Sequence, residues 1–301
     1  MSKTQNAKRR EIHTEHRSIP EDDWDCSGLD TLPPKSRRKR TLIWTDYASW
    51  RRPILRLLSD LIDTNALDEL SRNPPKYFGS RVLNQLGEII SKNAGVAYPD
   101  LQTILADRMR GHYEFIRAFH ACRSDSIEPY KQHGLTPCVP AALDKCAMEI
   151  FQNKEGVAAA IQDLALNDLE YSYRDFNNGK VWFCLEKEEL TENCGHYLLY
   201  GSEYLLAIAN RIGESEALRK RGRATLIECN VPIDDLAEDD TKELAADMLV
   251  KILETYCTRR CPDELTGFGF YIECKLEPNN IVQFHFPTAI PNPHRYYTRE
   301  D

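Results

Sequence analysis

The sequence has no run of about 18 apolar residues, the length that a membrane-spanning helix requires. Its first residues, MSKTQNAKRREIH, also lack the apolar core of a secretory signal peptide. Basic residues are not in excess, since the formal net charge is −8, which argues against a generally basic nucleic-acid-binding surface. Most of the ten cysteines stand in apolar runs, where a free thiol behaves as a small hydrophobe. These features predict a cytoplasmic protein with reduced thiols.

Several catalytic and metal-binding motifs are missing as well. The sequence has no glycine-rich phosphate-binding loop and no Gly-x-Ser-x-Gly nucleophile elbow. Cys257 and Cys261 have the spacing of half a zinc site, but no second close Cys/His pair accompanies them, so no metal is predicted. A cysteine–histidine nucleophile pair stays open, because no local signature favours or excludes one.

Composition divides the chain into four segments. Residues 1–40 alternate blocks of charge, including KSRRKR at 35–40, and are expected to form a flexible tail. Residues 41–112 carry leucine and isoleucine at helical spacing and are expected to be helical. Residues 113–290 mix strand and helix patterns, and residues 291–301 form a C-terminal tail.

The mixed segment contains five expected strands rich in β-branched and aromatic residues. They are EFIRAF (114–119), KVWFCLEK (180–187), ATLIECNVP (224–232), FYIECKL (270–276) and NIVQFHF (280–286). Helical patterns lie between them, and the one at 239–257 has Asp240 as its expected cap. Its apolar stripe comprises Leu244, Met248, Leu249, Ile252 and Tyr256. Because the strands do not alternate tightly with helices, the expected fold class is α+β.

The segment RAFHACRSDSIEPYKQHGLTP places polar groups where a strand is expected to give way to a helix. Asp125 and Glu128 have the spacing of a capping box at the start of that helix. His120 and Arg123 are therefore expected at a strand-to-helix junction, where side chains and free backbone groups hold polar or anionic ligands. The structural alternative is a histidine that satisfies a backbone group at the strand end.

A second polar group lies in CGHYLLYGSEYLLAIANRIG, which predicts one helix over 194–213. On such a helix His196, Tyr200, Glu203 and Ala207 are three or four residues apart and share one face. The opposite side carries leucines that would meet the core. The polar face is expected either to line a cleft or to form a structural network between helix and sheet, and both interpretations stay open.

These segments carry a resemblance to a known family. FHACR, a short helix and then HGL resemble the first strand of ADP-ribosyltransferases, in which a histidine is followed by Gly-Thr and later by Gly-Leu or Gly-Phe. KVWFCLEK resembles the second strand, and FYIECKL with NIVQFHF resembles the closing strands. The resemblance covers about residues 114–290. It implies a split mixed or antiparallel sheet of ADP-ribosyltransferase type with a helical N-terminal extension.

The resemblance also implies NAD as the substrate. In that superfamily the histidine hydrogen-bonds the adenosine ribose and the next residue's backbone holds the nicotinamide amide, roles that fall to His120 and Ala121. An aromatic of the second strand would lie near the nicotinamide, and the next helix supplies a hydroxyl and an aromatic in the poly-ADP-ribose polymerase branch. The implied NAD contacts are His120, Ala121, Arg123, Trp182 or Phe183, Ser202, and Tyr200 or Tyr204.

Two positions depart from the family pattern. Ala121 replaces the usual glycine, which backbone contacts tolerate if φ stays negative. The usual glutamate at the start of the penultimate strand is replaced by Phe270. Glu203 is the preferred substitute because it belongs to the polar group above, and Glu228 and Glu273 are weaker candidates.

The family chemistry explains why these residue types would be needed. Breaking the bond between nicotinamide and ribose produces an oxocarbenium-like ribose. A carboxylate near the ribose hydroxyls strengthens its hydrogen bond as positive charge develops. The expected catalytic residues are Glu203, His120 and Tyr200. The forked donors of Arg123 would meet the pyrophosphate.

The sequence ALRKRGR concentrates positive charge in one place on an acidic chain. Its basic residues are Arg219, Lys220, Arg221 and Arg223. They are interpreted either as a solvated loop or as a contact for nucleic-acid phosphates. KSRRKR (35–40) and Arg51-Arg52 would support such a contact. Three nearby aromatics are expected either to stack bases or to pack in the helical region, and they are Trp44, Tyr47 and Trp50.

The sequence therefore predicts an NAD-dependent mono-ADP-ribosyltransferase acting on a macromolecule, with nucleic acid favoured over protein as the acceptor. The resemblance permits a role as a bacterial toxin or in conflict with phage, together with an inhibitory partner protein. The alternative is a non-catalytic nucleic-acid- or protein-binding module on a similar fold, which the replaced glutamate favours. Turnover of NAD separates the two.

Overall fold

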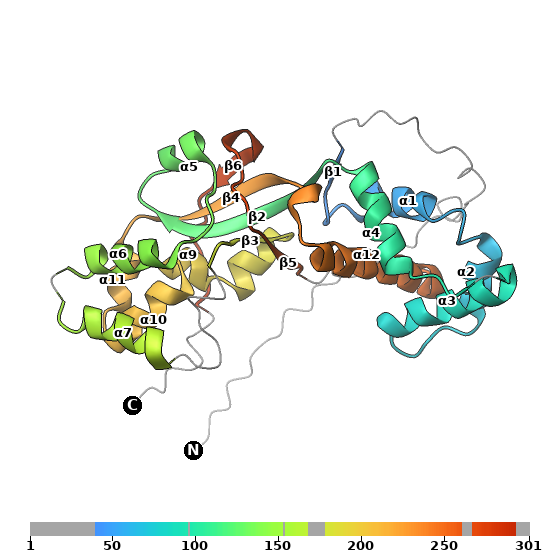
Figure 1. Ribbon diagram of the computed structural model, residues 1–301, viewed down its shortest axis with the longest axis horizontal. Helices are drawn as coiled ribbons and strands as arrows, with labels where there is room; N and C mark the ends of the chain where they lie inside the picture. Colours follow the sequence, from blue (N-terminus) through green and yellow to red (C-terminus); the bar gives the residue numbers. More distant parts are fainter. Residues whose placement is uncertain (1–39, 96, 153, 168–177, 261–266, 293–301) are drawn as a thin grey trace, which may run out of the picture.

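The computed structural model describes residues 40–95, 97–152, 154–167, 178–260 and 267–292, and its centre is a six-stranded sheet (Figure 1). The strands are β1 (Thr41–Leu42), β2 (Phe115–Ser124), β3 (Val181–Cys184), β4 (Arg223–Pro232), β5 (Gly269–Ile272) and β6 (Ile281–His285). Their order is β5-β3-β2-β4-β6, with β1 paired to β2 off this path. β1 is parallel to β2 and the other pairings are antiparallel, so the α+β class is confirmed.

Helices cover the two ends of this sheet. The N-terminal helices are α1 (Tyr47–Leu57), α2 (Thr64–Arg72), α3 (Ser80–Ala94) and α4 (Leu101–His112). Those that follow are α5 (Glu128–His133), α6 (Pro140–Ile150), α7 (Val157–Asn167), η2 (Glu189–Asn193), α9 (His196–Tyr200), α10 (Glu203–Arg211), α11 (Ser215–Lys220), η3 (Ile233–Asp235), α12 (Glu238–Thr258) and η4 (Pro278–Asn280). Figure 1 shows α1–α4 with α12 at one end, and α6, α7, α10 and α11 at the other. No helix in the described part of the chain is long and apolar enough to cross a membrane.

β2 and β4 form the longest ladder of the sheet. Ten residue pairs join the two strands, and the last is Ser124 opposite Arg223. The strand expected at 114–119 therefore continues to Ser124, because β4 pairs with it along its whole length. His120 and Arg123 lie within the strand, so their predicted position at a strand-to-helix junction was wrong.

The sheet splits on the other side of β2. β2 and β3 are paired at one position, Phe119 opposite Cys184. Beyond that pair β3 stays with β5, while β2 continues along β4. The split lies beside His120 and Ala121, the two residues to which the family resemblance gives the NAD contacts.

Alternating side chains of β2 point to opposite faces of the sheet. On one face Ala118 and Cys122 belong to the same core as α12, and we call this the α12 face. On the other face Ala121 packs in a smaller core with Leu198 of α9, and we call this the α9 face. By this alternation the His120 side chain lies on the α12 face, opposite the helix that carries the second predicted polar group.

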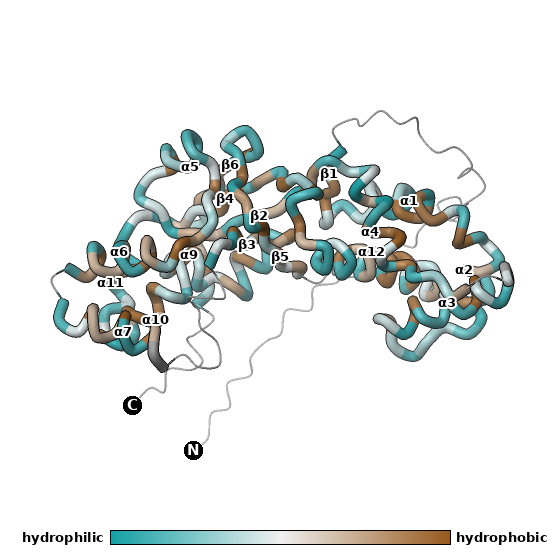
Figure 2. Tube along the Cα trace, viewed as in Figure 1, coloured by the Kyte–Doolittle hydropathy of each residue, from teal (hydrophilic) through white to brown (hydrophobic). Residues whose placement is uncertain are grey.

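The helical region shares its core with the sheet. Helices α1–α4 pack against α12, whose expected stripe is confirmed by the burial of Leu244, Met248, Leu249, Ile252 and Tyr256. Burying an aliphatic side chain of this size contributes about 1.5–3 kcal/mol. Asp240 was wrongly predicted as the cap, because the helix begins two residues earlier, after Ala237. Figure 2 shows hydrophobic stretches alternating with hydrophilic ones along these helices, as packing on one side requires.

The single helix expected over 194–213 is two helices, α9 and α10. Gly201 separates them with a φ of 90°, and the next residue, Ser202, caps α10 by accepting a hydrogen bond from the backbone of Leu205. A Cβ on Gly201 would lie 3.4 Å from the Cβ of Arg123, so the chain turns where it passes closest to β2. The shared helical face assumed from the sequence is therefore absent.

The two closing strands do not lie side by side. β5 completes the edge beyond β3, whereas β6 completes the opposite edge beyond β4. β5 ends at Ile272, so Glu273 follows the strand and is exposed. Glu273 therefore does not occupy a position within β5 from which it could substitute for the expected glutamate.

Gly134, which follows α5, lies against the backbone of Leu276. Its φ is +73°, and a Cβ would lie 1.9 Å from the carbonyl oxygen of Leu276, where Leu135 and Leu276 bridge the two segments. We expect Gly134→Ala to lower the free energy of unfolding by about 1–3 kcal/mol through backbone strain. Gly111→Ala in α4, which meets nothing within 4 Å, is the matched control and should not destabilise. Equal urea midpoints for the two variants would contradict the close contact.

Candidate functional site

His120 is fixed at the split in the sheet. Its Nδ1 atom lies 2.9 Å from the carbonyl oxygen of Trp182 in β3, and its ring centroid is 6.0 Å from that of Phe183. A carbonyl oxygen only accepts, so Nδ1 carries the proton and Nε2 is left as an acceptor. Burial lowers the pKa of His120 and outweighs the opposite effect of the hydrogen bond to Trp182. The imidazole is therefore neutral at pH 7.

The ring beside His120 on the α12 face belongs to a row of stacked aromatic side chains. Phe183 is stacked on Phe270 of β5 with a centroid separation of 5.6 Å, and Phe268 lies 6.5 Å from Phe270. Phe270, at the position where the family pattern has glutamate, is only 1% exposed. Within the described residues, no carboxylate is hydrogen-bonded to His120. The structure thus brings His120 and Phe183 together without a carboxylate partner.

Trp182 belongs to the opposite face of β3. Its ring lies 5.0 Å from that of Tyr271, and the Nζ atom of Lys180 is 5.6 Å from the first ring centroid and 4.2 Å from the second. Of the two aromatics expected near the nicotinamide, Phe183 is therefore the one beside the His120 ring. Trp182 contributes its backbone carbonyl instead.

The second predicted polar group lies below the α9 face. His196 Nε2 is 3.2 Å from a carboxylate oxygen of Glu203, which joins α9 to the start of α10. The Tyr200 hydroxyl accepts a hydrogen bond from Asn292 at 3.0 Å, and the Tyr204 hydroxyl donates to Asp144. These contacts resemble the structural network weighed from the sequence. They do not bring Tyr200, Tyr204 or Glu203 into contact with the His120 ring.

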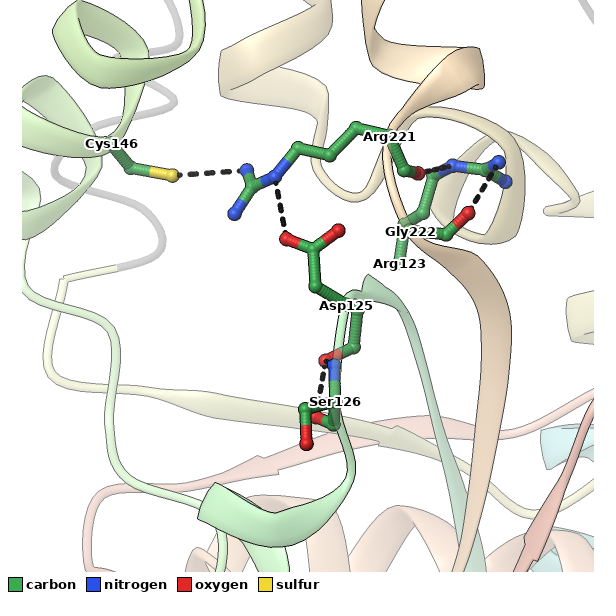
Figure 3. Close-up of polar contacts among 7 residues, drawn as sticks. Arg123, Asp125, Ser126, Cys146, Arg221 and Gly222 are labelled. Atoms are coloured by element: carbon green, nitrogen blue, oxygen red, sulfur yellow. Dashed lines mark hydrogen bonds and ion pairs between the residues drawn. The ribbon is translucent and has the colours of Figure 1, made fainter.

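Arg123 has a role that the sequence did not indicate. Its guanidinium donates to the backbone carbonyls of Leu198, Arg219, Arg221 and Gly222. Figure 3 shows Arg123 beside Arg221 and Gly222, with two of these contacts drawn. The guanidinium therefore ties β2 to α9 and to residues 219–223, which we call the basic loop. The expectation that all four basic residues lie in a loop was wrong, because Arg219 and Lys220 end α11 and Arg223 begins β4. The donors of Arg123 are directed at the backbone and not at an open site for a pyrophosphate.

Glu228 belongs to a polar group on the sheet that sequence reasoning missed. Arg117 forms an ion pair with Glu228 and donates to Asn230 at 2.9 Å, and His285 Nε2 lies 2.9 Å from the other Glu228 oxygen. Burial alone would raise the pKa of Glu228, but hydrogen bonds from His285 and Arg117 outweigh it and hold the pKa below its usual value. The only sequence signal was the period-two spacing of Glu228 and Asn230 in one strand.

The cysteines of the described residues are free thiols. None of the eight in the described residues forms a disulfide, and Cys261 lies outside the described residues. Burial raises the pKa of Cys194, the thiol nearest in sequence to His196, to about 11, and the charge of Glu189 adds to the effect. Such a thiol stays protonated at neutral pH. No group of three or more His, Cys, Asp or Glu residues in the described part of the chain could hold a metal ion.

The aromatics proposed to stack bases are part of the core. Trp44 and Trp50 are 1% and 0% exposed and stack on each other at 5.7 Å, so they cannot present faces to a ligand. The Trp44 indole donates to Glu186, just after β3, at 2.8 Å. The helical region is therefore bonded directly to the strand that carries Phe183.

Comparison with known proteins adds no relative, because neither a protein-family model, nor a curated protein, nor a solved structure matches this chain. The function must therefore be inferred from the split in the sheet, from the polar groups on its two faces and from the basic loop. Among these, only the split beside His120 and Ala121 coincides with residues to which the family resemblance assigns a specific chemical role. We take it as the candidate site.

The polar group around Glu228 predicts a pH-dependent contribution to stability. A carboxyl whose pKa is lowered by folding stabilises the protein above its unfolded pKa, and this stabilisation is lost as pH falls through the folded pKa. We expect Glu228→Gln to cost about 1–3 kcal/mol at pH 7, and the difference from the wild type to shrink below the usual pKa of 4.5.

Urea unfolding of both proteins between pH 7 and pH 3.5 measures this difference. Glu277→Gln, which alters an exposed ion pair with Lys275, is the matched control and should change stability by less than about 1 kcal/mol. A loss for Glu228→Gln that is the same at every pH would show that the charge of Glu228 is not what matters.

Proposed function

We propose that this chain is an NAD-dependent mono-ADP-ribosyltransferase whose NAD site lies at the split beside His120 and Ala121. The observation that carries the proposal is the single pairing between β2 and β3, Phe119 opposite Cys184. Past this pair, the edge of β2 that turns toward β3 has no strand partner in the described residues. Backbone groups at Ala121 would then be available for the nicotinamide amide. The order of His120, α5 and Gly134 along the chain is the order that the family resemblance requires.

The neutral His120 suits this proposal. Its Nδ1 proton is engaged by Trp182, so Nε2 can accept a hydrogen bond from a ribose hydroxyl without changing its protonation state. The Phe183 ring lies beside it, with its centroid 6.0 Å from that of His120. In the reaction, the bond between the ribose carbon and the nicotinamide nitrogen breaks, nicotinamide leaves neutral with the electron pair, and the acceptor attacks the ribose carbon and loses a proton.

Glu203 remains the proposed carboxylate. Ala121 faces α9, the helix that leads to Tyr200, Ser202 and Glu203, so a ribose held at the open edge of β2 would be approached from that side. The alternatives are weaker, because the Glu228 carboxylate is already ion-paired with Arg117 and in contact with His285, and Glu273 follows the end of β5. A macromolecular acceptor, with nucleic acid favoured by the basic loop, completes the proposal.

A second candidate function is a non-catalytic binding module. The observation that favours it is Phe270, which is 1% exposed and stacked on Phe183 where the family has its glutamate. A buried phenyl ring cannot stabilise positive charge on a ribose as a carboxylate does. The two functions differ in NAD turnover, which only the transferase shows.

The first test is release of free nicotinamide from NAD by the purified protein, with and without total RNA or cell lysate. We expect release by the wild type and a loss of about 10²-fold or more in His120→Ala, since removing the hydrogen bond to the adenosine ribose leaves NAD out of position for the reaction. His133→Ala, an exposed histidine of α5, is the matched control and should keep full activity. No release by any protein under any condition would favour the binding module.

A second variant tests the carboxylate. Glu203→Gln keeps the size and the hydrogen bond to His196 but removes the charge, so kcat should fall by about 10²–10³-fold while KM for NAD and the thermal midpoint change little. If kcat is retained, the charge is supplied elsewhere, and Glu228→Gln and Glu273→Gln are then compared in the same assay.

A further inference from the structure

A second site is suggested by an open pocket of about 380 Å³ between α6 and α11. It is lined by Glu149, Ile150, Ala217, Lys220 and Arg221. The volume lies within the range of about 300–1,000 Å³ that small-molecule sites occupy. None of these five residues is used by the proposed NAD site, so the pocket can be considered separately from it.

Arg221 is held in place at this pocket from several directions. Its Nε donates to Asp125 at 3.0 Å and its Nη1 lies 3.5 Å from the sulfur of Cys146 (Figure 3). Its backbone carbonyl accepts a hydrogen bond from Arg123. Within the described residues no group bonds the remaining nitrogen, Nη2. The guanidinium is therefore oriented before any ligand binds, while the N–H groups of Nη2 stay available to donate hydrogen bonds to a ligand.

The glycine that follows fixes the backbone of the same loop. Gly222 has a φ of +50°, and a Cβ there would lie 2.6 Å from the carbonyl carbon of Ser124, at the end of β2. The loop thus packs directly on the backbone of the central strand. Because Arg221 stands between this contact and α11, the loop has little freedom to move its guanidinium away from the pocket.

Lys220 supplies a second cation to the pocket. Its side chain is exposed, and it forms no ion pair within the described residues. Arg219, one residue earlier on α11, is instead paired with Glu216 at 3.0 Å and does not line the pocket. Of the four basic residues at 219–223, Lys220 and Arg221 line the pocket, and Arg221 does so while one side of its guanidinium is paired with Asp125.

We propose that this pocket binds a nucleotide through a single phosphate monoester, either as a free nucleoside 5′-phosphate or at the 5′ end of a strand. The phosphate would lie between Lys220 and Arg221, accepting from the Lys220 ammonium and from Nη2 of Arg221, while Nε of Arg221 stays paired with Asp125. Ile150 and Ala217 offer an apolar surface for a base, and the exposed Glu149 carboxylate can accept from a ribose hydroxyl. The same carboxylate disfavours ligands that bring many negative charges into the pocket.

The test is titration calorimetry of the full chain with adenosine 5′-monophosphate, adenosine and inorganic phosphate. We expect the monophosphate to bind at least tenfold more tightly than either fragment. Arg221→Gln and Lys220→Met should each weaken it by about tenfold or more, because each removes a charged hydrogen-bond donor. Arg219→Gln is the matched control, since it removes the same charge from the same helix outside the pocket, and it should bind within about twofold of the wild type.

Oligonucleotides with and without a 5′ phosphate distinguish the two sources of the ligand. A preference for the 5′-phosphorylated strand over the free monophosphate assigns the pocket to strand ends, and the reverse assigns it to free nucleotide. If Arg219→Gln weakens binding of adenosine 5′-monophosphate as much as Arg221→Gln and Lys220→Met do, general charge attraction explains the binding and the proposal is overturned. Equal affinity for inorganic phosphate, or no binding of any probe, would also overturn it. Lys220→Met alters an exposed side chain, so it remains informative if Arg221→Gln fails to fold.

Discussion

The ladder between β2 and β4 is the constraint on which the rest of the structure depends. Ten residue pairs keep β2 straight and central, and its alternating side chains enter two different cores. Because β2 is paired with β4 along its whole length, the sheet stays intact even though β3 pairs with the other edge of β2 at one position only. The same pairing places Arg117 within ion-pair distance of Glu228 and places Arg223 opposite Ser124, at the end of β2.

Local sequence patterns predicted the helices and strands whose residues show the hydrophobic period of that type of element. The stripe on α12 follows from a 3.6-residue period, and the strand at 224–232 follows from β-branched residues between turn signals. The end of β2 was not predictable in this way, because it is decided by a partner strand a hundred residues away. The break at Gly201 lies beside the Cβ of Arg123, a neighbour that the local helical pattern does not show.

The candidate site was predictable only in part, because some of its contacts follow from local sequence and others from strand pairing. His120 stood out from the order of residues around it, but whether Trp182 or Phe183 lies beside it depends on strand register, which the sequence does not contain. Arg123 was expected to bind a ligand because its neighbours in sequence are polar. In the fold its neighbours are backbone carbonyls from two other segments, and they give it a structural role. The group around Glu228 needs residues from three strands and so has no compact sequence signature.

The four carbonyls bonded by Arg123 have a consequence for local unfolding. They belong to α9 and to the segment formed by the end of α11 and the loop that follows it, and these two segments share this one side chain at the end of β2. Neither segment can separate from β2 without breaking hydrogen bonds that position the other. In hydrogen-exchange terms, the two segments form one cooperative unit, whose amides should open at a common free energy although some twenty residues of sequence separate them.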